Sequence, residues 1–387
     1  MQKIRLAMIG GGEGALIGNV HRIAARMDNE FELVAGDFSS DPERNLRSAN
    51  ALGVSDDRVY DTVEALIKGE KARPDGAEAV AIVTPNHLHF DAVKACLQAG
   101  FHVICDKPVT SALEDAVALV DIVRNAPGMF FLTHNYTGNA MVRQMRDMVL
   151  SGELGEIRFV NCEYVQDWLS EPVELQGSKA AEWRTDPQKA GAGGAIGDIG
   201  THAYNLASYV TGLTPDKLCA DLTSFIKGRR LDDNASILLR YDNGAKGQFW
   251  ISQVAIGNEN RLNCRIFGTK GSLEWSQEDP NRLWYCKSGQ PRAMLTRAGN
   301  GATHGNTQSG RVPPGHPEGF LEAFGNIYKS AANAIRSHQQ RKSDPSNIAY
   351  PTIEDGLNGL YFIDACIRSN EAANGWVDVE TCARESA

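Results

Sequence analysis

Three side chains that could transfer a proton or stabilise charge stand at positions typical of a reaction site. Lys107 follows the apolar run HVIC in Asp106-Lys107-Pro108, and Asp198 and His202 precede the helix-like segment AYNLASYVTG. If Asp198 opens that helix, it shares one face with His202, because residues four apart are neighbours on a helix. Histidine suits proton transfer near neutral pH, and a carboxylate can orient a hydroxyl or raise the basicity of an imidazole. The pair could therefore address one substrate carbinol.

Other interpretations of these residues stay open. A metal site would need a third ligand, and none stands at a convincing spacing from Asp198 and His202, so we expect no metal. Asp198 could instead cap a helix whose histidine lies in the core. Lys107 could be a surface residue in a turn.

A glycine-rich turn near the N-terminus predicts a dinucleotide site. Gly10, Gly12 and Ala15 fit the GxGxxG/A spacing after the strand-like run IRLAMIG, and Leu16 and Ile17 open a helix-like segment. A strand, turn and helix in this order let backbone N–H groups meet a pyrophosphate, while glycines permit its close approach. The motif alone is weak, and a merely flexible turn is the alternative. Its place on the first strand of an alternating array favours the dinucleotide.

The second strand-like run leaves the choice between NAD and NADP open. Asp37 could bind the adenosine ribose, as acidic residues at this position do in NAD-binding proteins. If the strand ends two residues later, the selecting position is Ser39, with Arg44 opening the next helix. Ser39 and Arg44 could accept a 2′-phosphate.

Further polar residues follow two other predicted strands. Thr84, Asn86 and His89 come after AVAIV, and Asp106 comes after HVIC. Open α/β sheets bind ligands at the carboxyl ends of their strands. We therefore expect these four residues to contribute to the cofactor site.

Two domains must position these residues. Residues 1–130 alternate short apolar runs with helix-like segments, which predicts a Rossmann-type doubly wound parallel sheet. Residues 131–387 contain long strand-like stretches with DNG and GTKG turns, which predict an α+β domain around an open, largely antiparallel sheet. A polar, glycine-rich segment at about 286–316 is too long for an ordinary connection and predicts a functional lid or a mobile excursion.

Composition excludes several classes of protein. The chain of 387 residues has 42% hydrophobic residues and 39 basic against 48 acidic side chains, with no extended run of either sign. This balance argues against nucleic acid as the main partner. Eight scattered cysteines without CxxC spacing predict reduced structural thiols. No membrane span or secretory signal is evident, so we expect a cytoplasmic protein with no membrane partner.

Four motifs in order along nearly the whole chain resemble the glucose–fructose oxidoreductase, inositol dehydrogenase and rhizopine-catabolism (Gfo/Idh/MocA) family. They are the glycine turn, TPNHLH at 84–89, DKP at 106–108 in place of the usual EKP, and GDIGTHAYNL at 197–206. The resemblance implies a Rossmann domain that binds NAD or NADP. It also implies an α+β domain whose open sheet packs against a partner subunit, in dimers or tetramers.

The resemblance also implies a reaction. Lys107, Asp198 and His202 match the family's catalytic lysine and its aspartate–histidine pair. His202 is then expected to take a proton from a ring hydroxyl while hydride passes to the nicotinamide, with Lys107 stabilising alkoxide charge and Asp198 orienting the sugar. The extended glycine loop and the shorter carboxylate of Asp106 depart from the family pattern, and they affect the expected contacts with the pyrophosphate and the nicotinamide ribose.

Two further residues suggest a branch that acts on sugars, inositols or anhydrosugars. Arg184, in WRTDP, and His316, in HPEG, could reach sugar hydroxyls, although an ion-pair partner and a loop cap are the alternatives. One rival function is a glycoside hydrolase that uses NAD transiently through a 3-keto intermediate. Another is a dinucleotide-sensing protein that keeps the fold without the chemistry.

Overall fold

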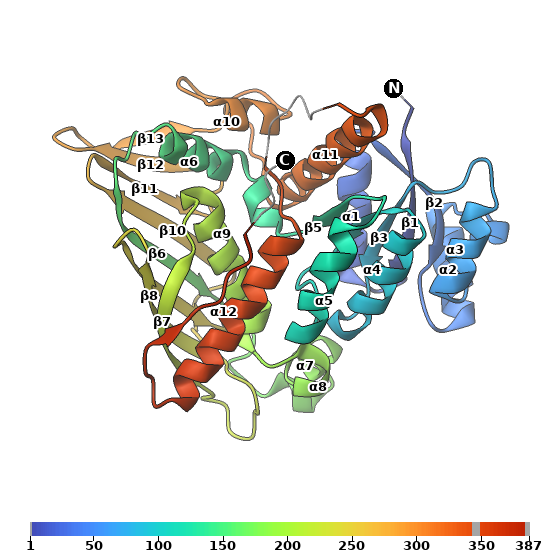
Figure 1. Ribbon diagram of the computed structural model, residues 1–387, viewed down its shortest axis with the longest axis horizontal. Helices are drawn as coiled ribbons and strands as arrows, with labels where there is room; N and C mark the ends of the chain where they lie inside the picture. The colour runs from blue at the N-terminus through green and yellow to red at the C-terminus, as the bar shows by residue number, and fades with distance from the viewer. Residues whose placement is uncertain (1, 343–348, 384–387) are drawn as a thin grey trace. The chain divides into compact units, whose positions relative to one another are not determined.

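The computed structural model describes residues 2–342 and 349–383, and within them the chain forms two compact units, each with its own sheet (Figure 1). Unit 1 comprises Met1–Thr110, Glu114–Gly138 and Phe320–Gly356, and unit 2 comprises Ser111–Leu113, Asn139–Gly319 and Leu357–Ala387. The predicted fold class, a parallel Rossmann-type sheet followed by a mostly antiparallel one, is confirmed. No helix of the described residues is long and apolar enough to cross a membrane.

Unit 1 is built on a parallel sheet with the order β2-β1-β3-β4-β5. Its strands are β1 (Ile4–Gly10), β2 (Phe31–Asp37), β3 (Ala79–Val83), β4 (His102–Cys105) and β5 (Phe130–Leu132). Strands β3 and β4 are buried at every position, as expected for parallel strands covered on both faces. The order of the strands reverses at β1, with β2 added on one side and β3 on the other, so the loops after β1 and β3 flank the point where such sheets bind ligands.

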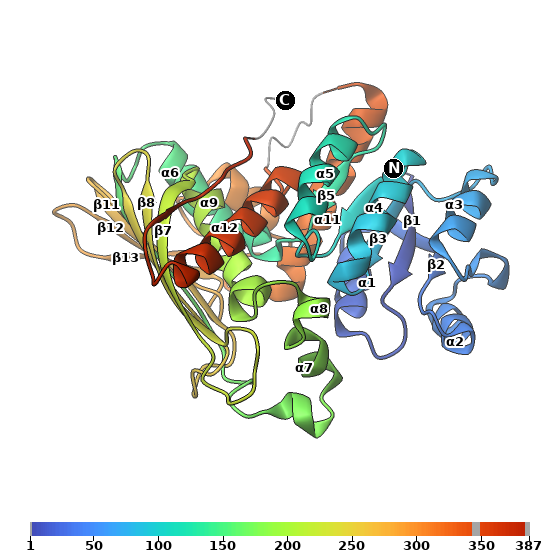
Figure 2. The same ribbon diagram turned by 60° about the horizontal axis from the view of Figure 1, so that its bottom comes forward.

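Helices cover both faces of this sheet, and one of them comes from far along the chain. They are α1 (Leu16–Met27), α2 (Pro42–Leu52), α3 (Val63–Lys71), α4 (His89–Gln98), α5 (Leu113–Arg124) and α11 (Phe320–Gln340). Helix α11 packs against α1, and its Phe324 and Tyr328 belong to the same hydrophobic core as β1. Helices α4 and α5 lie side by side (Figure 2). The boundary expected at 130–131 falls inside β5 of the first sheet, and unit 1 continues to Gly138. The segment Phe320–Gly356, which contains α11, then returns to unit 1.

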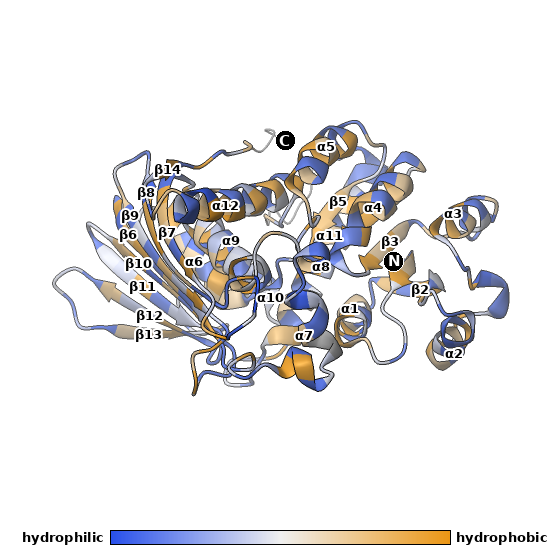
Figure 3. Ribbon diagram, turned by 90° about the horizontal axis from the view of Figure 1, so that it is seen from below, coloured by the Kyte–Doolittle hydropathy of each residue, from blue (hydrophilic) through white to orange (hydrophobic). Residues whose placement is uncertain are grey.

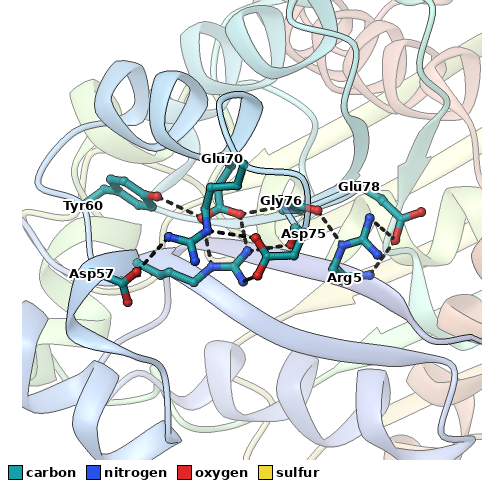
Figure 4. Close-up of polar contacts among 10 residues, drawn as sticks. Arg5, Asp57, Tyr60, Glu70, Asp75, Gly76 and Glu78 are labelled. Carbon is teal, nitrogen blue, oxygen red and sulfur yellow. Dashed lines mark hydrogen bonds and ion pairs between the residues drawn. The ribbon is translucent and has the colours of Figure 1, made fainter.

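A buried ion-pair network fastens α3 to the strand that follows it (Figure 4). Glu70 has no exposed surface on its side chain and pairs with Arg58, from the turn η1 (Asp56–Arg58). It also accepts hydrogen bonds from the Tyr60 hydroxyl at 2.9 Å and the Ala77 N–H at 2.8 Å. Because a buried carboxylate is costly unless it is paired and hydrogen-bonded, these contacts fix the start of β3.

Unit 2 is built on a sheet of nine strands among the described residues, in the order β13-β12-β11-β10-β6-β9-β8-β7-β14. The strands are β6 (Ile157–Val165), β7 (Pro215–Thr223), β8 (Asn234–Tyr241), β9 (Lys246–Ser252), β10 (Arg261–Gly268), β11 (Gly271–Ser276), β12 (Arg282–Lys287), β13 (Ala293–Thr296) and β14 (Val377–Asp378). Only β6 and β9 pair in parallel among these. The predicted hairpins at DNG and GTKG join β8 to β9 and β10 to β11.

Helices line one side of this sheet, whose strands carry both hydrophobic and hydrophilic residues (Figure 3). The helices of unit 2 are α6 (Ala140–Leu150), α7 (Lys179–Arg184), α8 (Pro187–Ala190), α9 (Thr201–Thr211), α10 (His304–Ser309) and most of α12 (Ile353–Glu371). Burial alternates along β8 and β9, so one face packs on the helices and the other is exposed.

The glycine-rich segment at 286–316 is folded rather than loose. It contains β13 and α10, and its hub is the buried Arg297, which donates to the carbonyls of Val312, Pro313 and His316. Buried Asn306 of α10 donates to Gln144 of α6 at 2.8 Å. These contacts tie the segment together and fasten it to α6.

Candidate active site

The glycine loop is shaped by contacts that leave no room for side chains. Gly10 and Gly11 have positive φ angles, which favour glycine. A Cβ on Gly18 of α1 would lie 2.4 Å from the Gly11 Cα, so these two glycines let the helix approach the turn closely. Ala15, which we placed at the third motif position, is the N-cap of α1 and has no side-chain capping bond. The close helix packing expected there is made by Gly18.

The extension of the loop is held by helix α2. The Glu13 N–H donates to Ser48 Oγ at 3.0 Å, and the Arg44 guanidinium donates to the Glu13 carbonyl. Gly12 donates through its N–H to the Phe38 carbonyl at 3.1 Å. The structure therefore places Arg44 as a brace of the glycine loop, and the first helical residues Leu16 and Ile17 follow directly.

Strand β2 ends at Asp37, and not two residues later. Burial, together with the neighbouring Asp61 and Glu64 carboxylates, raises the pKa of Asp37 to about 6. Ser39 lies beyond the strand, and its hydroxyl accepts a hydrogen bond from the Asp41 N–H at 3.2 Å. The end of β2 is thus acidic.

The loop after β3 contains a buried polar atom that fits a ligand. Among the described residues, the Thr84 hydroxyl oxygen and the Asn135 amide nitrogen, which follow β3 and β5, are buried without a hydrogen-bond partner. Thr84 also borders the glycine turn, since a Cβ on Gly10 would lie 3.0 Å from its Cγ2. Asn86 is buried at the start of the turn η2 (Asn86–Leu88). An unpaired hydroxyl beside a glycine cradle suits a bound dinucleotide.

His89 joins the loop after β3 to the loop after β4. Its side chain is fully buried, with Nδ1 2.9 Å from the Pro108 carbonyl and Nε2 2.9 Å from the Thr84 carbonyl. Burial lowers the pKa of His89, against the opposite effects of Asp106 and the two carbonyls. The ring therefore braces two site loops, and a contribution to cofactor binding would act through them.

Asp106 is held by groups from two other elements. The Thr133 hydroxyl donates to its Oδ1 at 2.8 Å, and His21 Nε2 of α1 lies 3.5 Å from the same oxygen. Burial alone would raise the pKa of Asp106, but His21, Lys107 and Thr133 bring it below its usual range. Burial and the Lys107 charge lower the pKa of His134 to about 3. Lys107 thus lies among the groups at the ends of β4 and β5.

Asp198 and His202 lie on one continuous helical element of unit 2. The element begins with a π-helical turn, η5 (Ile196–Gly200), and continues as α9. Asp198 lies inside the π turn, so it does not open a regular helix as expected. The N–H groups at the start of the element are bound by the distant Asp232, which accepts from Gly194 at 2.6 Å and from Ile196 at 2.9 Å. π-Helical turns occur frequently at functional sites.

Asp198 is bound by two side chains of unit 2. The Nε of Arg184 donates to its Oδ2 at 3.2 Å, and the Nε2 of Gln253 donates to the same oxygen at 2.9 Å. The Arg184 guanidinium also lies 4.1 Å from the Trp183 ring and 5.9 Å from the Trp168 ring. Arg184 is therefore an ion-pair partner of Asp198, and it lies beside the residue that we expect to bind substrate.

His202 is 7% exposed and faces Tyr164 of β6, their ring centroids being 6.0 Å apart. The Tyr164 hydroxyl donates to Asn260 Oδ1 at 2.9 Å, and Gln166 Nε2 donates to the same oxygen at 2.7 Å. Trp168 Nε1 donates to Gln166 Oε1 at 2.9 Å. Amide, phenol and indole groups therefore surround the Asp198–His202 pair, as in a site for a polyhydroxylated ligand.

His316 is exposed, and its backbone N–H donates to the Pro313 carbonyl while its own carbonyl accepts from Arg297. The neighbouring Glu318 is the residue that organises this segment, since it accepts the N–H groups of Arg311 and Val312 and pairs with Arg297 at 3.5 Å. Nothing in these contacts joins the His316 side chain to Asp198 or His202.

Sequence reasoning missed several residues that shape these sites. Gly18 could have been found, because the run GGGEGALIG contains more glycines than the motif needs. No local signal marks the others, whose partners lie far along the chain. They are His21, Gln166, Gln253, Asn260 and Tyr164.

The parallel sheet with its glycine turn defines a dinucleotide-binding domain, here joined to a second domain built on a mostly antiparallel sheet. Residues 4–134 match the oxidoreductase family with an NAD-binding Rossmann fold, and residues 142–274 match the GFO/IDH/MocA C-terminal domain. The chain therefore belongs to the Gfo/Idh/MocA family of oxidoreductases, as the four motifs predicted.

Several similar proteins match nearly the whole chain. An oxidoreductase from Sinorhizobium meliloti is 50% identical with a TM-score of 0.88, over 97% of this chain and 100% of that one. An inositol dehydrogenase homolog from Azotobacter vinelandii, complexed with NADH and myo-inositol, is 37% identical with a TM-score of 0.91, over 97% and 98%. The levoglucosan dehydrogenase of Pseudarthrobacter phenanthrenivorans is 26% identical over 98% of this chain and 99% of its own.

Proposed function

We propose that the protein is an NAD-dependent dehydrogenase that oxidises or reduces a ring carbinol of an uncharged sugar, inositol or anhydrosugar. The observation that carries the proposal is the placement of a carboxylate and an imidazole, Asp198 and His202, on one helical element among hydrogen-bonding side chains. Similar proteins of known name act on myo-inositol and levoglucosan, both of which are neutral ring polyols. Arg184, the arginine in contact with Asp198, is already paired with that carboxylate, which suits a substrate without a phosphate.

Each proposed catalytic side chain has a distinct role. His202 removes the hydroxyl proton of the reacting carbinol during oxidation and returns it during reduction. Lys107 donates a hydrogen bond to the same oxygen and stabilises the negative charge that develops there. Asp198 accepts a hydrogen bond from a substrate hydroxyl and so orients the ring. The bound nicotinamide supplies the hydride acceptor or donor.

The dinucleotide would be held by unit 1. The turn at Gly10–Gly12 and the first N–H groups of α1, from Leu16 and Ile17, suit the pyrophosphate. The unpaired Thr84 hydroxyl and the buried Asn86 follow β3 at the switch point of the sheet. Asp106 is already held by His21 and Thr133, so its part in cofactor binding would be to fix the loop that carries Lys107.

NAD is the proposed cofactor, in preference to NADP. Asp37 ends β2, and Asp61 and Glu64 are near enough to raise its pKa. An additional phosphate dianion there would meet like charges, whereas ribose hydroxyls can donate to a carboxylate. Arg44, the residue that could have accepted the phosphate, is engaged with the glycine loop.

A second copy of the chain is the proposed partner of the exposed face of the large sheet. Large apolar side chains are exposed on several of its strands, namely Leu238, Trp250, Phe267, Trp284 and Met294. An apolar face of this kind marks an interaction surface. We therefore expect a dimer or tetramer formed through this sheet.

The proposal is tested by absorbance at 340 nm with NAD and then NADP against a panel of inositols, aldoses and anhydrosugars. Reduction of NAD with a narrow set of neutral polyols is the expected result. Glycoside cleavage without net NADH formation would identify the hydrolase instead. Tight NADH binding without turnover of any polyol or glycoside would identify a dinucleotide sensor.

A further inference from the structure

Gln253 is a buried amide whose nitrogen faces the carboxylate of Asp198. The residue is 2% exposed and directly follows β9, and its Nε2 lies 2.9 Å from Asp198 Oδ2 and 3.5 Å from Gln166 Oε1. Both neighbours are acceptors, so the orientation of the amide is determined. The backbone is held as well, since the Gln253 N–H donates to Asp233 and its carbonyl accepts from Leu169.

The indole of Trp168 determines the direction of every hydrogen bond in a chain of side chains that runs through Gln166 to Gln253 and Asp198. Trp168 Nε1 can only donate, and it donates to Gln166 Oε1. Gln166 must therefore direct its nitrogen to Asn260, and its oxygen toward the Gln253 nitrogen. Reversing the Gln253 amide would set its oxygen against both Asp198 and Gln166. Every link of the chain thus requires Asp198 to be an acceptor at Oδ2.

Arg184 binds the same oxygen but is held less firmly. It lies on the six-residue helix α7, and its side chain is 28% exposed. Gln253 lies at the end of a strand in the middle of the sheet, with its backbone bonded on both sides. Of the two donors, Gln253 is the one fixed by the fold.

We propose that Gln253 is a positioning residue that keeps Asp198 ionised and in one orientation, so that Asp198 accepts a hydrogen bond from a substrate hydroxyl. The inference rests on the proposed function, in which Asp198 contacts the substrate. The ionised carboxylate of Asp198 is stabilised by a group that can only donate to it. The Gln253 nitrogen is such a group, because the hydrogen bonds of Trp168 and Gln166 fix the orientation of its amide.

Two substitutions of Gln253 separate this role from simple packing. Gln253→Leu removes the donor, and kcat/KM for the best polyol of the panel should fall about 10- to 100-fold at every pH, as for a lost hydrogen bond to a charged group. Gln253→Glu keeps the shape. When the introduced carboxyl group is protonated, it can donate a hydrogen bond to Asp198. When it is ionised, it repels the Asp198 carboxylate.

The pH profile of Gln253→Glu is therefore the diagnostic reading. The ratio of its kcat/KM to that of the wild type should fall at least tenfold between pH 6 and pH 9. Among the described residues, the charged and titratable groups on the segments near this position are Asp198, Arg184, His202, Tyr164, Asp167 and the Asp233–Arg229 pair. Because all are shared with the wild type, the ratio isolates the added carboxyl group. A ratio independent of pH would overturn the proposal.

A second measurement does not depend on turnover. The Tm of Gln253→Glu relative to the wild type should fall over the same pH range, because a second carboxylate must ionise beside Asp198. Gln290→Leu and Gln290→Glu, in the exposed β12–β13 turn, are the matched controls and should show no such trend. If the wild type oxidises no polyol, the proposed function fails, and the Tm series alone decides whether Gln253 holds Asp198. A flat Tm difference would overturn the proposal.

Discussion

Replacing Asp37 by asparagine should stabilise the protein and weaken its binding of NAD. Burial and the Asp61 and Glu64 charges raise the pKa of Asp37 from 3.8 to about 6, so its ionisation opposes folding at neutral pH. A raised pKa means that the penalty is absent below about pH 3.8 and complete above about pH 6. The upper limit is about 3 kcal/mol. Because the side chain is partly exposed, we expect about 1–2 kcal/mol after solvent screening.

Thermal unfolding measures this directly. At pH 8, Asp37→Asn should raise the Tm by about 2–8 °C relative to the wild type. The gain should shrink as the pH is lowered from 6 toward 4. Asp242→Asn, in the exposed turn between β8 and β9, is the control and should leave the Tm unchanged at both pH values. A stabilisation that is the same at pH 4 and pH 8 would refute the electrostatic argument.

The same variant tests the cofactor assignment. If Asp37 binds the adenosine ribose, Asp37→Asn should raise the KM for NAD about tenfold or more and narrow the preference over NADP. Titration of NADH binding by fluorescence provides an independent reading. A variant more stable than the wild type, with unchanged affinity for NAD, would show that Asp37 is an acidic residue without a role in the cofactor site.

Three further substitutions test the packing of the glycine turn, the buried ion pair of unit 1 and the exposed face of the large sheet. Gly18→Ala places a methyl group against Gly11 and should lower the stability of the fold by about 1–3 kcal/mol and reduce the affinity for NADH. In the control Gly359→Ala, the nearest neighbour of the added methyl group lies at 3.7 Å, so this change should be tolerated. Equal Tm values for the two variants would contradict the close packing of α1 against the glycine turn. Glu70→Gln leaves Arg58 without its buried partner and should cost about 3 kcal/mol by thermal unfolding, whereas Asp57→Asn, which removes an exposed ion pair, should leave the Tm close to that of the wild type. Trp250→Glu on the exposed face of the large sheet should reduce the molecular mass measured by light scattering, whereas the control Leu150→Glu on α6 should not. An unchanged mass for Trp250→Glu would exclude that face as the contact between subunits.

The parts of the fold that were predictable depend on local patterns. The runs AVAIV and HVIC predict strands buried on both faces, because every residue in them is apolar or stands at a strand end. Both strands are buried at every position in the structure. The DNG and GTKG turns marked two hairpins because tight reversals need residues that tolerate unusual backbone angles. Lys107, Asp198 and His202 stood out for their residue types next to such elements.

The remaining features depend on contacts between distant segments. Nothing in the sequence of α11 shows that it returns to unit 1, because an amphipathic pattern does not specify its partner. The partnership of Gln253 with Gln166 joins residues 87 positions apart. The π turn at Ile196–Gly200 differs from an α-helix by one residue of hydrogen-bond spacing, which no local propensity encodes.

The most direct test of the proposed chemistry is the single-turnover rate of NADH formation at 340 nm, in the wild type and in His202→Ala, with NAD and the best neutral polyol saturating. If His202 is the general base, the variant should bind NADH as the wild type does and react about 10²- to 10⁴-fold more slowly. A variant that forms NADH at nearly the wild-type rate would contradict the assignment of His202 as the group that takes the proton.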